Sequence, residues 1–342
     1  MRAFITGLAG PVLTAEERQF LKDAEPWGVI VFKRNVTEPK VLRRLIDDVR
    51  NALGRSAPVL IDQEGGRVQR LGPPHWPAYP PGAAYGALYD LDRAAGLRAA
   101  KLGARLIAAD LAVLGIDVDC LPIADVPVPG ADPIVGDRAY GTEPGKVAAI
   151  AGAIAAGLAE GGVLPVLKHI PGHGRATADS HQRLPVVTAD RATLDGTDFA
   201  VFRPLSGLPL GMTAHVVFTA FDPVAPATTS AIIVREVIRD SIGFRGLLMS
   251  DDISMGALSG SLGERTAAAL TAGCDMVLHC NGEMPEMRAV AAAAPVLAGE
   301  AARRAAAALA MRKPAAPVDL AARRAEFENL MAGVSQGARG LA

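Results

Sequence analysis

Eight short apolar runs recur along the chain, and they restrict its fold more than any other feature of the sequence. The runs cover residues 4–7, 28–32, 59–62, 117–124, 163–169, 210–218, 246–251 and 275–280. They are continuously apolar rather than alternating, which is typical of strands buried on both faces of a parallel sheet. Segments with helical spacing separate them, at residues 38–53, 91–114, 144–160, 231–241 and 263–272. Eight strands that alternate with helices predict an α/β fold, a single-domain (β/α)8 barrel of the TIM type.

The whole chain, residues 1–342, is predicted to form this one domain, because no convincing linker divides it. The connection at residues 65–86 is rich in Pro and Gly, so we expect an irregular active-site loop there. Residues 286–342 are rich in Ala and Arg. They predict a helical extension that covers the barrel, helical to about residue 331 and frayed over its last few residues.

Charge and composition exclude several classes of protein. The net charge of −1 gives no electrostatic reason to expect binding to nucleic acid or to an anionic membrane. The N-terminus is a poor signal peptide, and no run of about 18 apolar residues predicts a membrane span. We therefore expect a cytoplasmic protein. The three cysteines contain no CxxC pair and are expected to be reduced, with Cys280, at a strand end, open to a minor role at the site.

Polar residues gather where the apolar runs end. They are Asp62, Asp125, Lys168, His169, His215, Asp251, Asp252, His279 and Asn281. In a (β/α)8 barrel the C-terminal ends of the strands carry the active site. Randomly placed polar residues would not collect at one end of so many strands, so the pattern predicts an enzyme.

The loop after the fifth run, residues 167–181, contains three of the six histidines. His169 and His173 are four residues apart, a spacing that could bind a metal ion on a helix. Pro and Gly residues between and beside them break any helix, so we expect no metal and no other cofactor. Asp179 and His181 form the alternative, an acid/base pair in which the carboxylate fixes the tautomer of the imidazole. On these residues alone, a turn-forming aspartate beside a surface histidine is about equally plausible.

The seventh run ends in two acidic residues. Asp251 follows the strand directly, so its carboxylate is expected to point into the mouth of the barrel. There it can act as a nucleophile or stabilise a developing cation. A helix N-cap is the structural alternative, and Asp252 fits that role better.

The segment IDQEGGRVQRL offers groups that suit a sugar. Asp62 can accept hydrogen bonds from two hydroxyls, and Arg70 can hold a further polar group with its fork of donors. An ion pair between the two is an equally good explanation. The Gly pair is not a phosphate loop, because the Walker spacing and its lysine are absent. Arg138 lies in GDRAYG, and that motif by itself predicts only a surface arginine.

These motifs together resemble glycoside hydrolase family 3, specifically its single-domain β-N-acetylhexosaminidases of the NagZ type. The resemblance runs from about residue 10 to residue 281. It depends on the order and spacing of GPVLTAEERQFL, GVIVFKRN, DQEGGRVQRL, GDRAYG, KHIPGHG with DSH, MTAHVVF and MSDDISM.

The resemblance implies a role for each candidate residue. Asp179 and His181 match the acid/base dyad, and Asp251 matches the nucleophile. Substrate contacts map to Asp62, Arg70, Arg138, Lys168 and His169. The implied enzyme needs no metal and releases terminal β-linked N-acetylglucosamine from 1,6-anhydromuramyl muropeptides in bacterial peptidoglycan recycling. Its partner is then a small carbohydrate, and we expect a monomer.

Two departures from the family pattern are visible. Ile170 stands where the family commonly has Phe, and Arg175 stands where it commonly has Asp. Both precede the dyad and leave it intact, although Arg175 adds a cation beside the loop. The second domain of larger family members is not expected.

The implied mechanism retains the configuration at the anomeric carbon. Asp251 attacks it, and His181 protonates the leaving oxygen and then deprotonates water. Because a neutral histidine repels anions less than a carboxylate does, phosphate is an alternative acceptor. Three other kinds of protein remain as alternatives: a metal-dependent barrel hydrolase, a non-catalytic sugar-binding protein, and a family 3 β-glucosidase.

Overall fold

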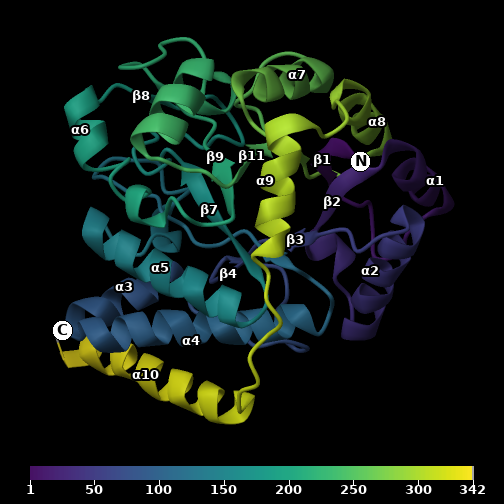
Figure 1. Ribbon diagram of the computed structural model, residues 1–342. Helices are drawn as coiled ribbons and strands as arrows, with labels where there is room; N and C mark the ends of the chain where they lie inside the picture. Colours follow the sequence, from purple (N-terminus) through teal and green to yellow (C-terminus); the bar gives the residue numbers. More distant parts are fainter. Residues whose placement is uncertain (341–342) are drawn as a thin grey trace.

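Eight parallel strands close into a barrel in the computed structural model, which describes residues 1–340 (Figure 1). The strands are β1 (Arg2–Thr6), β2 (Pro26–Val31), β3 (Val59–Ile61), β6 (Val118–Asp119), β7 (Leu164–Ile170), β9 (Leu210–Thr213), β11 (Leu247–Asp252) and β12 (Met276–His279). Their order around the barrel is β1-β12-β11-β9-β7-β6-β3-β2. Each strand overlaps one of the eight predicted runs, so the predicted (β/α)8 barrel is confirmed.

Helices surround the barrel. They are α1 (Ala15–Ala24), α2 (Pro39–Leu53), α3 (Gly82–Leu91), α4 (Arg93–Ala112), α5 (Pro144–Glu160), α6 (Arg191–Gly196), a π-helical segment (Ile233–Ser241), α7 (Leu262–Ala272), α8 (Met284–Ala293), α9 (Gly299–Ala310) and α10 (Leu320–Gly340). Local chemistry sets several of their starts. At α1, for example, the Thr14 hydroxyl accepts from the backbone N–H of Glu17, whose carboxylate accepts in return from the backbone N–H of Thr14.

The interior of the barrel is a packed core. Ile5, Leu60, Val166 and Met249, from four different strands, belong to one fully buried cluster. Side chains of α9 join the same cluster, and Arg304 of α9 pairs with Asp275 just before β12 (2.8 Å). Helix α9 therefore closes the N-terminal end of the barrel, and the C-terminal end remains free for a site.

The C-terminal region is mostly helical, as its composition predicts, but the helix continues past residue 331. It forms three helices, α8 to α10, separated by non-helical residues 294–298 and 311–319. Helix α10 lies along α4 and α3 (Figure 1). Its Phe327 is buried, with the ring 6.3 Å from that of Tyr85 and 6.5 Å from that of Tyr79. The last two residues of the predicted extension, 341 and 342, lie outside the described residues.

The connection at 65–86 is more regular than predicted. It starts with a hairpin of β4 (Gln63–Gly65) and β5 (Val68–Gln69), and helix α3 begins at Gly82. Gly65 has φ +94°, and a Cβ there would lie 2.4 Å from the backbone oxygen of Pro80, so only glycine fits. A second small sheet pairs β8 (Val186–Val187) with β10 (Val217–Phe218). Within residues 1–340, no helix combines the length and the apolar character needed to cross a membrane.

Candidate active site

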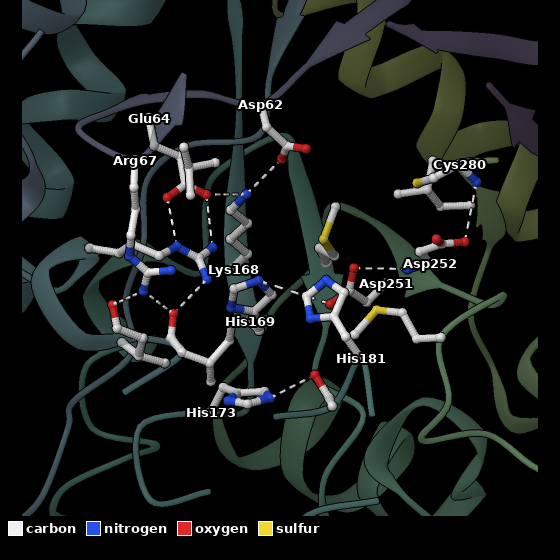
Figure 2. Close-up of a pocket in the computed structure, with 18 of the residues that line it drawn as sticks. Asp62, Glu64, Arg67, Lys168, His169, His173, His181, Asp251, Asp252 and Cys280 are labelled. Carbon is white, nitrogen blue, oxygen red and sulfur yellow. Dashed lines mark hydrogen bonds and ion pairs between the residues drawn. The ribbon is translucent and has the colours of Figure 1, made fainter. Parts of the chain in front are cut away.

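A cavity of about 260 Å³ opens at the C-terminal ends of the barrel strands (Figure 2). Its size is slightly below the range typical of small-ligand sites, roughly 300–1,000 Å³. All but one of the predicted site residues line it: Asp62, Arg70, Arg138, Lys168, His169, His181 and Asp251. The exception, Asp179, does not line the cavity but holds His181, which does.

Five charged residues form one connected group on one side of the cavity, which we call the charge cluster. The Lys168 ammonium lies 2.9 Å from Asp62 Oδ1 and 2.8 Å from Glu64 Oε1. Arg70 Nη2 donates to Asp62 Oδ2 at 3.0 Å. Arg138 grips Glu64 with two hydrogen bonds of 2.8 Å, one to each carboxylate oxygen. The ion pair and the sugar-binding role that the sequence suggested for Asp62 and Arg70 are thus compatible, because both residues also face the cavity.

The charge cluster stays ionised. Burial alone would raise the pKa of the Asp62 carboxyl, but Lys168 and then Arg70 outweigh burial and hold it below its ordinary value. Burial also raises the pKa of the Glu64 carboxyl, but Lys168 and Arg138 outweigh burial, so this pKa is lowered as well. The two carboxylates in turn raise the pKa of Lys168 despite its burial. A sugar entering the cavity would meet fixed charged acceptors and donors.

Glu64 is a member that the sequence analysis missed. It lies in the segment IDQEGGRVQRL, where only Asp62, Arg70 and the Gly pair were considered. A signal was present, because residues i and i+2 of an extended segment point to the same side. Asp62 and Glu64 have that spacing, and both reach Lys168.

Asp251 lies on β11 with its side chain 18% exposed. Its Oδ1 accepts from the backbone N–H of Asp252 at 2.8 Å, and its Oδ2 lies 4.0 Å from His169 Nε2. Burial raises the pKa of Asp251, but His169 and then His215 outweigh burial and lower it. The carboxylate is therefore ionised at neutral pH, as a nucleophile requires.

Asp125 orients the imidazole that faces Asp251. Its Oδ2 is 2.7 Å from His169 Nδ1. Burial opposes ionisation of Asp125, but His169 outweighs burial and lowers the pKa to about 2. The ionised carboxylate can only accept, so Nδ1 carries the proton and Nε2 is directed toward Asp251.

Asp179 and His181 form a direct pair on the loop between β7 and β8, residues 171–185, which we call the dyad loop. Asp179 Oδ1 is 2.7 Å from His181 Nδ1 and also accepts from the His181 backbone N–H at 2.9 Å. Burial raises the pKa of Asp179, but these two hydrogen bonds more than compensate and lower it. The imidazole is 62% exposed and lines the cavity, and among the described residues no hydrogen bond to its Nε2 is found.

One expectation about a neighbouring residue is corrected. Asp252 caps no helix: its carboxylate accepts from the backbone N–H groups of Ser254 (3.0 Å) and Cys280 (3.2 Å), and α7 is capped by Ser261 instead. Arg175 adds a cation within the dyad loop, as the sequence indicates, but it does not line the cavity, and Asp198 and Thr197 hold its guanidinium. Its charge is therefore satisfied within the protein.

The histidines of the site have protein partners. His215 Nδ1 lies 2.7 Å from Thr228 Oγ1, and its Nε2 lies 3.0 Å from the backbone oxygen of Asp252. His279 is buried and bound to Glu286 at 2.9 Å, outside the cavity, whereas Cys280 lines it. In the part of the chain that the structure describes, no group of three or more His, Cys, Asp or Glu side chains is arranged to hold a metal ion.

The family model described as the glycosyl hydrolase family 3 N terminal domain matches residues 7–310. The chain belongs to glycoside hydrolase family 3. It is therefore a glycoside hydrolase, as the sequence motifs predict.

Relatives and solved structures of this family resemble the chain closely. A β-hexosaminidase of Alkalilimnicola ehrlichii is 42% identical over 283 residues, which are 80% of this chain and 79% of the relative. Another of Aromatoleum aromaticum is 36% identical over 278 residues, 80% and 78% of the two chains.

Among structures, NagZ from Neisseria gonorrhoeae in complex with N-trifluoroacetyl-D-glucosamine superposes with a TM-score of 0.84 at 30% identity, covering 98% of this chain and 97% of that one. A family 3 β-N-acetylglucosaminidase from Paenibacillus sp. str. FPU-7 gives a TM-score of 0.84 at 28% identity. That match covers 96% of this chain but 66% of the longer Paenibacillus chain.

Proposed function

We propose that this protein is a retaining exo-β-N-acetylhexosaminidase that releases terminal β-linked N-acetylglucosamine. One observation carries the proposal: the ionised Asp251 and the Asp179-bound His181 line the same cavity as the charge cluster. The names of the relatives, β-hexosaminidase and NagZ, support the sugar specificity.

In the first step, Asp251 attacks the anomeric carbon and forms a covalent glycosyl-enzyme. Its Oδ1 is occupied by the backbone N–H of Asp252, which leaves Oδ2 for the attack. His181 starts as an imidazolium whose Nδ1–H is bound to Asp179 and whose Nε2–H protonates the glycosidic oxygen. The aglycone leaves as an alcohol, and His181 becomes neutral.

In the second step, water enters where the aglycone was. Neutral His181 takes a proton from it at Nε2 while the oxygen attacks the anomeric carbon and the bond to Asp251 breaks. The sugar leaves with its original configuration, and both catalytic groups return to their starting protonation.

The charge cluster and His169 bind the sugar in this proposal. Asp62 and Arg70 act on ring hydroxyls, and Arg138, Lys168 and His169 complete the contacts. The positions of these five residues around one cavity support the assignment.

The natural substrate that we propose is a 1,6-anhydromuramyl muropeptide. The enzyme would then act as a cytoplasmic monomer in peptidoglycan recycling. Purified muropeptides test the substrate: the expected product is free N-acetylglucosamine, and an intact muropeptide after prolonged incubation contradicts this part.

Trapping the glycosyl-enzyme tests the mechanism. A 5-fluoro N-acetylglucosaminyl substrate should leave a covalent adduct that peptide mass spectrometry places on Asp251. Asp251→Ala should abolish both adduct and turnover while sugar still binds. Near-normal activity of Asp251→Ala, or an adduct on another residue, would show that the nucleophile is wrongly assigned.

The remaining alternatives are separated by simple assays. A family 3 β-glucosidase would hydrolyse a chromogenic glucoside as well as the matching N-acetylglucosaminide, and a sugar-binding protein would hydrolyse neither. Product analysis in phosphate buffer decides the acceptor, since only phosphorolysis yields a sugar phosphate. A chelator should leave activity unchanged if no metal takes part.

A further inference from the structure

The dyad loop raises the question of what holds it in place. Residues 171–185 contain neither helix nor strand, and His181 itself is mostly exposed. Its neighbour Ser180 is different, because only 3% of it is exposed. Ser180 Oγ lies 3.0 Å from Nε2 of His173, at the start of the same loop (Figure 2).

His173 is fixed from the barrel side. Its backbone N–H donates to Asp125 Oδ1 at 2.6 Å, and its ring packs edge-to-face against His169 at 5.8 Å. Asp125 thus holds the imidazole that faces Asp251 and also the residue that reaches Ser180.

The tip of the loop is fastened a second time, to the segment that follows β11. The backbone N–H of Ala257 donates to the backbone oxygen of Ser180 at 3.1 Å, and the backbone N–H of Gly256 donates to the backbone oxygen of His181 at 3.2 Å. The approach needs glycine: a Cβ at Gly256 would lie 2.9 Å from the backbone oxygens of His181 and Gln182. This segment begins five residues after Asp251, so it ties the loop to the strand that carries the nucleophile.

We propose that the His173–Ser180 hydrogen bond and the Gly256–Ala257 backbone contacts form a latch that holds His181 over the cavity. His173, Ser180 and Gly256 are then positioning residues for the proton transfer, and none of them reacts. This inference rests on the proposed role of Asp179 and His181 as acid and base.

The chemistry of His173 fits a weak latch whose protonation does not change near pH 7. Burial lowers its pKa to about 4, so the ring is neutral near pH 7. Nδ1 is buried without a partner in the described residues, which favours the tautomer with its proton on Nε2, donating to Ser180. One neutral hydrogen bond changes an equilibrium by roughly 2- to 10-fold. The loop can therefore open to admit substrate and release sugar.

The test uses two aryl N-acetyl-β-glucosaminides. Phenol is a poor leaving group that needs a proton from His181, whereas dinitrophenol leaves without one. Ser180→Ala should lower kcat/KM for the phenyl substrate by about 2- to 10-fold and leave that for the dinitrophenyl substrate unchanged. Gly256→Ala should act in the same direction through its clash with the loop. A general loss of structure would instead lower both values equally.

Two controls lie at the opposite end of the barrel. Ser206 and Gly207 precede β9, and a Cβ at Gly207 meets nothing within 4 Å. Ser206→Ala and Gly207→Ala should leave kcat/KM unchanged for both substrates. Hydrogen exchange of peptides within residues 174–183 gives an independent readout, and exchange should be faster in Ser180→Ala than in the parent.

His181→Ala separates the two proposals. If His181→Ala loses activity selectively on the phenyl substrate but Ser180→Ala and Gly256→Ala do not, the latch is wrong and the acid/base assignment stands. If His181→Ala shows no such selectivity, the assignment falls and this inference falls with it. Selective loss in all three variants, with faster exchange in Ser180→Ala, supports the latch.

Discussion

Glu64 offers a sharp test of the charge cluster, because replacing one carboxylate oxygen by an amide nitrogen removes one negative charge. The cluster contains two carboxylates, Asp62 and Glu64, and three cations, so its net charge is +1. Glu64→Gln keeps the shape of the side chain and raises this net charge to +2. It leaves Arg138 and Lys168 facing each other without their shared counter-ion.

The size of the effect follows from burial. The side chains of Glu64, Arg138 and Lys168 are 4%, 12% and 3% exposed. Removing one partner of a buried ion pair typically costs about 3–5 kcal/mol. The amide keeps one acceptor oxygen, so we expect Glu64→Gln to lower the free energy of unfolding by about 2–4 kcal/mol.

A matched control is the same substitution in an exposed pair. Glu160 pairs with Lys101, and their side chains are 51% and 45% exposed. Glu160→Gln should cost less than about 1 kcal/mol.

Urea unfolding at pH 7 measures the free energy of unfolding of both variants. Urea is uncharged, so it does not screen the ion pairs. The fluorescence of the fully buried Trp27 reports the transition. The folded-state pKa of Glu64 is lowered, so its contribution is complete above the unfolded pKa near 4.3 and is lost as pH falls through the folded value. The difference between Glu64→Gln and the parent should shrink below about pH 4. Equal losses for Glu64→Gln and Glu160→Gln at pH 7 would refute the reasoning.

Three further predictions concern stability. Burial raises the pKa of Asp119 well above its ordinary value and so favours the neutral acid, and Asp119→Asn should change the free energy of unfolding in urea by less than about 1 kcal/mol. His173 has a folded pKa of about 4, so between about pH 6.5 and 4 the unfolded chain binds more protons and stability falls as pH drops, by up to about 3 kcal/mol; urea titrations across this window should be flatter for His173→Phe. Phe327→Ala should cost about 3 kcal/mol by removing a buried ring between α10 and α4, measured as a lower urea midpoint, and no loss would mean that α10 does not contribute to the fold.

The barrel could be predicted because its strands are buried on both faces. Runs such as residues 163–169 contain almost no polar residue until the strand ends, so the polar side chains also indicate which end holds the site. Asp62 and Asp251 were found in this way, and both line the cavity.

The contacts between loops could not be predicted. Ser180 lies close to His173 and Ala257 only because the chain folds back, and no local pattern specifies those pairs. Asp252 was misassigned for a related reason. A helix cap depends on local sequence. The partners of Asp252 instead include the backbone N–H of Cys280, which lies nearby only because β11 pairs with β12.

The division of labour between barrel and loop has an evolutionary consequence. Asp251 and Lys168 are built into strands β11 and β7, where a change disturbs the sheet. His181 and Asp179 belong to a segment that contributes to no barrel strand. Insertions and deletions can therefore change the length of the dyad loop, or replace its proton donor, and leave the sugar-binding residues of the barrel intact. Leaving-group preference and sugar preference can then diverge independently among descendants of one barrel.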